Sequence, residues 1–183
     1  MTLDIETIKE SLSDKEIIGL VIPGAEYDEM LIELSAILSK SYNKILYISA
    51  NKPYGLLVNK FKQTKADVDK FHFIDCITRR SKDVSSTKNC TYVFSPGALD
   101  ELQRAIIDVL RKQEIDVALI DSPSSLLIYQ EHMDILQFMD RLITIFTVAN
   151  CKAIFPFQKD SMELLRRGIE MFTDKTVHLY VLT

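Results

Sequence analysis

One carboxylate stands where a short apolar segment ends. Residues 117–120 read Val-Ala-Leu-Ile and are followed by Asp121 and the serine-rich stretch Ser122-Pro123-Ser124-Ser125. Such a run is typical of a strand buried on both faces of a parallel sheet. Ligands of open α/β sheets bind at the carboxyl ends of strands, so Asp121 is a candidate for binding or acid–base chemistry. The alternative is structural, with Asp121 accepting hydrogen bonds from Ser122, Ser124 or Ser125.

The cysteines and histidines, which can serve as nucleophiles, bases or metal ligands, form no recognisable catalytic or metal-binding set. Cys76 follows Asp75 at the end of an apolar segment, but no histidine is identifiable as its base, which favours a buried thiol. The three cysteines form no C-x-x-C pair and have no metal-ligand spacing with the three histidines. The sequence therefore predicts neither a metal site nor a cysteine nucleophile.

Length, amino-acid composition and net charge restrict the classes of protein to which this chain can belong. The chain has 183 residues, of which 47% are hydrophobic and 26% charged, as expected for one globular domain spanning residues 1–183. A net charge of -4 provides no electrostatic footprint for nucleic acid or for an anionic membrane surface. Sparse cysteines, no membrane-length apolar run and no signal peptide indicate a cytoplasmic protein.

Apolar segments typical of strands alternate with amphipathic segments typical of helices along the whole chain. Strands are expected at residues 17–22, 45–49, 71–76, 117–121, 152–157 and 177–182, with Pro156 closing the fifth. Helices are expected at 3–12, from Tyr27, from Pro53, from Ser95-Pro96 to 110, at 133–146, and up to Phe172 behind an Asp160–Glu163 capping box. Residues 79–89 are expected to form a solvated loop. This alternation predicts an α/β fold of three layers, α/β/α, around a mainly parallel central sheet.

The order of these segments resembles that of the RecA-like P-loop ATPases, and within them the KaiC and RadA-type group. The resemblance rests on the segment Leu46-Tyr47-Ile48-Ser49 leading to Pro53, on Phe73-Ile74-Asp75, and on the helix at 95–110 that leads into the Asp121 strand. It covers the chain from Ile17 to about Phe157 and implies a RecA/KaiC-like core. The family's site residues carry over only where this sequence matches them.

The phosphate-binding loop that the resemblance implies, G-x-x-x-x-G-K-[ST], is degenerate in this chain. The first strand-to-helix turn contains Gly24 but no lysine and no hydroxyl residue before the helix. It carries Glu26, Asp28 and Glu29 instead, and like charges about 4 Å apart repel by roughly 4 kcal/mol at an effective dielectric near 20. We expect one of these three side chains to cap the helix in place of a phosphate.

The catalytic glutamate that the resemblance implies after the second strand is also missing. The segment reads Ser49-Ala50-Asn51-Lys52-Pro53, which leaves Asn51 in that region and no acid. Asp121, followed by Ser122, is the one family residue that matches, at the position that binds Mg²⁺ through water. The sequence has no loop after residues 155–159 that could bind DNA as recombinases of this family do.

Three hypotheses follow. The first is a non-catalytic, pseudo-ATPase domain that serves as a regulatory or scaffolding module, with a protein partner and no cofactor. The second is a signalling switch that binds ATP or another nucleotide without hydrolysis. The third is an enzyme of unrelated chemistry that uses a crevice around Asp121, Asn51 and Asp75. Under the first hypothesis we expect a monomer or a nucleotide-independent homodimer, with the loop at 79–89 free for a partner.

Overall fold

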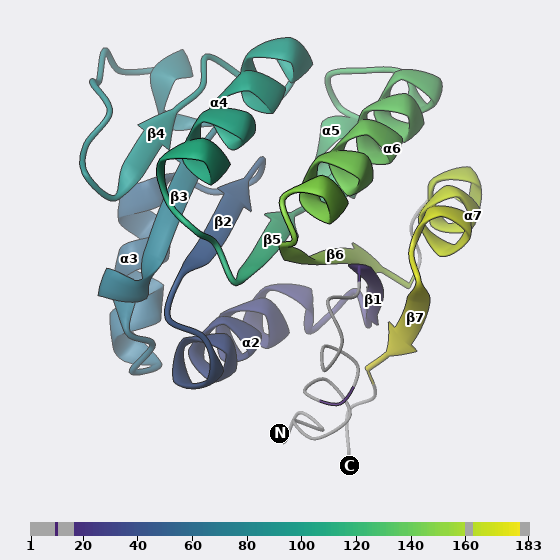
Figure 1. The fold of residues 1–183 in the computed structure, drawn as a ribbon, viewed down its shortest axis with the longest axis horizontal. Helices are drawn as coiled ribbons and strands as arrows, with labels where there is room; N and C mark the ends of the chain where they lie inside the picture. Colours follow the sequence, from purple (N-terminus) through teal and green to yellow (C-terminus); the bar gives the residue numbers. More distant parts are fainter. Residues whose placement is uncertain (1–9, 11–16, 160–162, 180–183) are drawn as a thin grey trace.

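In the described part of the chain the central sheet has seven parallel strands. A computed structural model of the chain describes Glu10, residues 17–159 and residues 163–179. The strand order is β4-β3-β2-β5-β6-β1-β7, and every pairing is parallel (Figure 1). The strands are β1 (Ile17–Ile22), β2 (Ile45–Ser49), β3 (Phe71–Asp75), β4 (Cys90–Tyr92), β5 (Val117–Asp121), β6 (Lys152–Gln158) and β7 (Lys175–His178).

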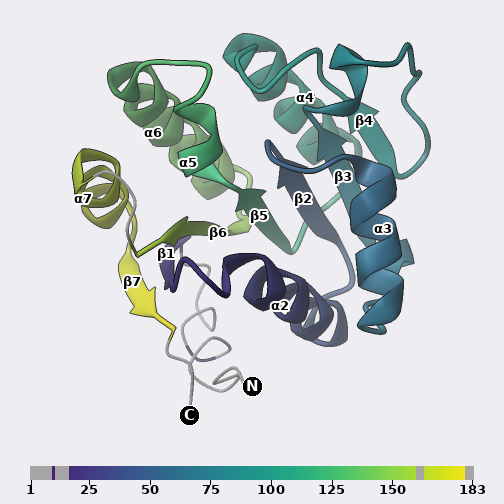
Figure 2. The ribbon, with the colours of Figure 1, turned by 180° about the vertical axis from the view of Figure 1, so that it is seen from behind.

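Helices cover both faces of this sheet, as Figures 1 and 2 show from opposite sides. They are α2 (Tyr27–Ser41), α3 (Tyr54–Gln63), α4 (Leu99–Lys112), α5 (Pro123–Leu126), α6 (His132–Val148) and α7 (Glu163–Phe172), with short 3₁₀ turns η1 (Val68–Lys70) and η2 (Thr78–Arg80). One apolar cluster joins α2 and α3 to the sheet, and a second joins α4, α5, α6 and α7 to its other face. The predicted three-layer α/β/α fold is therefore confirmed.

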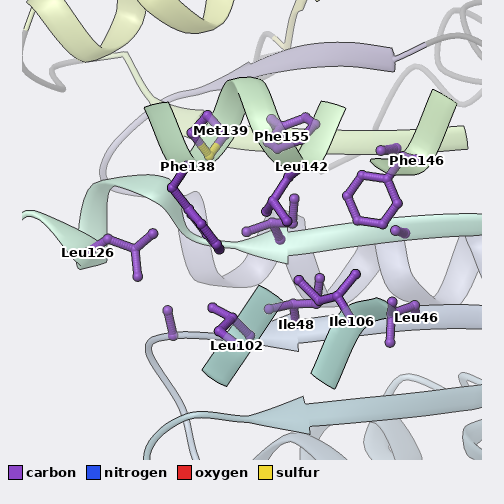
Figure 3. Close-up of a cluster of buried hydrophobic side chains, with 14 of the residues drawn as sticks. Leu46, Ile48, Leu102, Ile106, Leu126, Phe138, Met139, Leu142, Phe146 and Phe155 are labelled. Carbon is purple, nitrogen blue, oxygen red and sulfur yellow. The ribbon is translucent and has the colours of Figure 1, made fainter. Parts of the chain in front are cut away.

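The second cluster shows how the apolar periodicity of the helices is used. In Figure 3, Leu102 and Ile106 of α4 and Phe138, Leu142 and Phe146 of α6 approach the sheet, where Leu46 and Ile48 of β2 lie. All of these side chains are buried. Since helices cover both faces, β1, β2 and β5 are buried at every residue, which explains why their sequences are almost continuously apolar.

Several predicted boundaries were wrong. Strand β4 was not expected, because three residues carry too little periodicity to be recognised. Helix α4 begins at Leu99 behind Ala98, so the Ser95-Pro96 pair precedes the helix and does not open it. The serine-rich stretch after Asp121 forms the short helix α5. Pro53 is the N-cap residue of α3.

Strand β6 continues through Pro156 to Gln158 instead of ending at the proline. Its pairing with β5 stops at Ile154, whereas its pairing with β1 runs on through Pro156 and Phe157. The proline therefore lies where β6 has only one neighbour, so its missing N–H interrupts no bond to β5. The predicted helix at 3–12, Asp160 of the capping box and the end of the last predicted strand lie outside the described residues.

Candidate functional site

Asp121 is the last residue of β5 and lies at the carboxyl end of the sheet. The carboxyl group is buried, and β5 pairs with β2 so that Asp121 lies opposite Ser49. Its Oδ2 accepts a hydrogen bond of 2.8 Å from the Tyr47 hydroxyl, which comes from the neighbouring strand. Its Oδ1 has no hydrogen-bond partner within the described part of the chain. The peptide bond between Asp121 and Ser122 is cis.

Lys52 brings a positive charge to this carboxylate. Its Nζ lies 2.6 Å from Asp28 Oδ1, in the first turn of α2, and 3.9 Å from Asp121 Oδ2. The Lys52 side chain is 10% exposed and the Asp28 side chain 52% exposed, so the bridge runs from the interior to the surface. We call Asp28, Lys52 and Asp121 the lysine bridge.

The backbone around Lys52 is held by the last residue of β2. The Ser49 hydroxyl donates to the Lys52 carbonyl at 2.7 Å and accepts from the Lys52 N–H at 3.0 Å. This tight turn directs the chain into Pro53 and α3 and fixes the point from which the lysine side chain extends. The lysine bridge therefore joins three elements, namely α2, the β2–α3 turn and β5.

The electrostatics of the site follow from burial. Burial raises the pKa of Asp121 above its ordinary value, and the Lys52 charge and the Tyr47 hydrogen bond oppose that rise. Burial first, and the Asp121 charge second, also raise the pKa values of Tyr27 and Tyr47 well above the usual tyrosine value. Both tyrosines are therefore neutral hydroxyl donors at physiological pH.

The beginning of α2 differs from our expectation. Glu26 is its N-cap residue, but no side chain makes a capping hydrogen bond there, and Asp28 is engaged with Lys52. The expected capping of this helix by Glu26, Asp28 or Glu29 is therefore wrong. The turn is anchored differently, since the Tyr27 hydroxyl donates to the Pro156 carbonyl of β6 at 3.2 Å.

The hydrogen bonds around the serine-rich stretch also differ from our expectation. The Ser122 hydroxyl caps α5, since it accepts from the Ser125 N–H at 3.3 Å and lies 2.9 Å from the Ser125 hydroxyl. Of the expected donors Ser122, Ser124 and Ser125, the first and the last are engaged with each other, and the hydrogen bond to Asp121 Oδ2 comes from Tyr47. The structural role proposed for Asp121 thus has a different partner, and that partner lies on the adjacent strand.

Asp75 is a structural carboxylate. Oδ1 accepts from the N–H groups of Ile77 at 2.7 Å and Thr78 at 2.9 Å, and Oδ2 accepts from the Tyr54 N–H at 2.7 Å and from the Thr78 hydroxyl. These bonds hold the turn after β3 to the start of α3. Asn51 is exposed, and its side chain is among the groups that oppose the rise in the pKa of Asp121. The crevice hypothesised around Asp121, Asn51 and Asp75 therefore brings Asn51 to Asp121, whereas the Asp75 carboxylate is used by three backbone N–H groups and the Thr78 hydroxyl.

Lys52 and Tyr47 were missed as site residues by sequence reasoning. Tyr47 lies within an apolar strand, so its sequence pattern indicates a core residue. Lys52 lies in the turn after β2, where the family resemblance drew attention to the missing glutamate and not to the lysine. The thiols are inert by comparison, since Cys76, Cys90 and Cys151 are buried and burial raises the pKa of each. Among the described residues no group of three or more His, Cys, Asp or Glu could hold a metal ion.

Comparisons with known proteins identify the fold. No family model and no curated protein matches the sequence. Among solved structures, the chain is similar to a KaiC-like protein from the hyperthermophilic archaeon Pyrococcus horikoshii, with a TM-score of 0.64 and 14% identity over 90% of this chain and 71% of that one. Within the described residues no helix is long and apolar enough to cross a membrane. The chain therefore has the α/β fold of a KaiC-like, RecA-type protein.

Proposed function

We propose that this chain is a non-catalytic RecA/KaiC-like domain, a pseudo-ATPase that acts as a regulatory or scaffolding protein-interaction module in the cytoplasm. The observation that carries the proposal is the lysine bridge. Lys52 Nζ lies within 4 Å of both Asp28 and Asp121, so the carboxylate expected to attract Mg²⁺ already has an internal cation.

The residues around Asp121 do not fit Mg-ATP, the cofactor that the fold family implies. The turn before α2 has no lysine and no hydroxyl residue, and the half-exposed Asp28 in the first turn of α2 is already paired with Lys52. Phosphate groups at this helix N-terminus would lie beside Glu26, Asp28 and Glu29. Like charges about 4 Å apart repel by roughly 4 kcal/mol at an effective dielectric near 20. The turn between β2 and α3, Ser49 to Pro53, carries no acid that could activate a water.

Exposed apolar side chains support a protein partner. Most of the large ones in the described chain lie in loops or first helical turns at the carboxyl end of the sheet, namely Leu56, Phe94, Ile128, Met133 and Leu164. Met171 and Val148, near the ends of α7 and α6, lie at the other end. We propose that side chains of this end of the sheet contact the partner, since an apolar patch that they formed together would mark an interaction site. We propose a monomer or a nucleotide-independent homodimer, with no nucleic-acid or membrane partner.

A second candidate is nucleotide binding without hydrolysis. The observation that favours it is Asp121 Oδ1, a buried polar atom without a partner among the described residues, which the donor of a ligand could satisfy. In that case contacts to adenine and ribose would have to replace the phosphate contacts.

The melting temperature decides between the two candidates. A ligand that binds only the folded state raises it, by the equivalent of about 2.7 kcal/mol at a hundred times the dissociation constant. We expect no rise with ATP, ADP or GTP at millimolar concentration, with or without Mg²⁺. A rise that is abolished by Asp121→Ala would favour the nucleotide switch and contradict the first proposal.

A further inference from the structure

Two adjoining hollows lie at the outer edge of the sheet, far along the sheet from β1. One, of about 600 Å³, lies between β4 and α4, and the other, of about 430 Å³, lies beside the start of β3. They share His72, Lys88 and Gln113, so they form one continuous depression. We call it the β4 groove. Its first part has the volume of a site for a metabolite-sized molecule.

The loop at 81–89 forms one wall of the β4 groove. The Thr87 N–H donates to the Cys90 carbonyl at 2.8 Å, and the Ser86 hydroxyl accepts from the Tyr92 N–H at 3.3 Å. These bonds pin the loop to the outer edge of β4, which would otherwise be open to pairing with another strand. The second half of this loop therefore has a structural position beside the groove, and its availability to a protein partner stays a prediction.

Unpaired positive charge distinguishes the β4 groove. Lys88 from the loop and Arg104 and Lys112 from α4 line it, and none of them forms an ion pair within the described part of the chain. The acids that line it are Asp69, Glu101 and Asp108, and Glu101 already lies 3.6 Å from Arg79 and accepts the Phe94 N–H. With Lys44 and Lys70 of the second hollow, five cations thus face three carboxylates on a chain whose net charge is -4.

Hydroxyl groups and an apolar floor complete the lining. Ser86, Thr87 and Thr91 border the groove, and Val93 and Val109 lie beneath it. Burial, and then the nearby Lys112 charge, lower the pKa of His72, whose Nε2 lies 2.9 Å from the Thr91 hydroxyl. His72 is therefore neutral at physiological pH and offers a polar, uncharged contact to a ligand.

We propose that the β4 groove binds a small organic anion that carries two or more phosphate or carboxylate charges. Lys88, Arg104 and Lys112 would meet these charges from two sides, and Val93 and Val109 would contact the body of the molecule. Arg104 and Lys112 come from the same helix, about two turns or 12 Å apart along its axis, so their long side chains must turn toward each other to contact one small anion. The groove is lined by other residues than the lysine bridge, so this site is independent of the function proposed above.

Titration of ¹⁵N-labelled protein with pyrophosphate and, separately, with citrate tests the proposal at low ionic strength. We expect saturable amide shifts confined to the region of Thr87, Thr91, Arg104 and Lys112, and weaker binding as salt is added. The tighter of the two anions identifies the ligand chemistry as phosphate or carboxylate.

Matched variants control for nonspecific charge effects. Arg104→Ala/Lys112→Ala should weaken binding at least tenfold, and α4 should remain folded because alanine favours helices. Arg111→Ala removes a charge from the same helix on the side that faces α6, outside the lining of the groove, and should leave binding unchanged. Absence of saturable shifts with both anions at 10 mM, shifts elsewhere, or equal binding by the double variant would overturn the proposal.

Discussion

Lys52 Nζ lies 2.6 Å from Asp28 Oδ1, so a lysine after β2 and an aspartate in the first turn of α2 are joined across the carboxyl end of the sheet. The same ammonium group lies 3.9 Å from the buried Asp121 Oδ2. One side chain thereby compensates two carboxylates, one nearly inaccessible and the other half exposed. The buried carboxylate keeps a permanent counter-charge that belongs to the chain itself.

Lys52→Met is expected to lower the free energy of unfolding by about 3 kcal/mol, because removal of one partner leaves the buried Asp121 carboxylate uncompensated. Urea unfolding at pH 7 measures this change. Lys62→Met is the matched control, since Lys62 is an exposed residue of α3 without an ion pair among the described residues. Equal stability of the two variants would show that the lysine bridge contributes nothing.

A comparison of Asp28→Asn with Glu29→Gln separates the effect of the lysine bridge on stability from the effect of surface charge in general. Both acids are exposed and adjacent in the first turn of α2, but only Asp28 contacts Lys52. We expect Asp28→Asn to destabilise the protein by about 0.5–1 kcal/mol, as for a partly exposed pair, and Glu29→Gln to stay within about 0.5 kcal/mol of the parent. A larger loss from Glu29→Gln would instead favour a role of that residue at the helix N-terminus.

Tyr47→Phe removes the hydrogen bond that Asp121 accepts. The expected loss is about 1–3 kcal/mol, because the carboxylate is buried and no water-exposed surface replaces the donor. The control is Tyr54→Phe, since Tyr54 packs against Phe73 by its ring and its hydroxyl makes no hydrogen bond to any residue that the structure describes. Thermal unfolding of both variants checks the difference, and a Tyr47→Phe protein as stable as the control would contradict it.

The pH dependence of the free energy of unfolding should show that the pKa of Asp121 is raised in the folded state. Because its folded-state pKa is raised above the ordinary value of 3.8, the folded chain holds a proton that the unfolded chain has released. The contribution of Asp121 to the free energy of unfolding therefore falls as the pH rises from about 4 to the folded-state pKa. Above the folded-state pKa this contribution is constant. Asp121→Asn lacks this dependence, so its stability relative to the parent should increase with pH over that window. A relative stability that is flat with pH would show that the folded-state pKa is not raised.

The fold was predictable from the sequence because long elements repeat a strong pattern. Continuous apolar runs such as 17–22 indicated strands buried on both faces, and the spacing of Leu102, Ile106 and Val109 indicated the inward face of α4. Strand β4 was not predictable, since its three residues are held by neighbours distant in sequence. The end of β6 was predicted too early, because a proline ends a strand only where a neighbouring strand needs its missing N–H. At Pro156 the pairing of β6 with β5 has already stopped, and its pairing with β1 continues.

The site was predictable only in part. The position of Asp121 followed from the strand that precedes it, and the acidic turn before α2 was evident from composition. The contact between Lys52 and Asp28 was not, because 24 positions separate them and only the sheet order brings them together. Glu26, Asp28 and Glu29 were treated as equivalent acids, whereas the geometry gives only Asp28 a cationic partner.

ATP turnover by the purified chain tests the central claim most directly. The account predicts no phosphate release in the presence of Mg²⁺ above that of a mock preparation purified in parallel, because Lys52 compensates Asp121 and the segment 49–53 has no acid that could activate water. Asp121→Ala and the parent should be indistinguishable in this assay. Turnover by the parent that exceeds the mock preparation and is lost in Asp121→Ala would contradict the account.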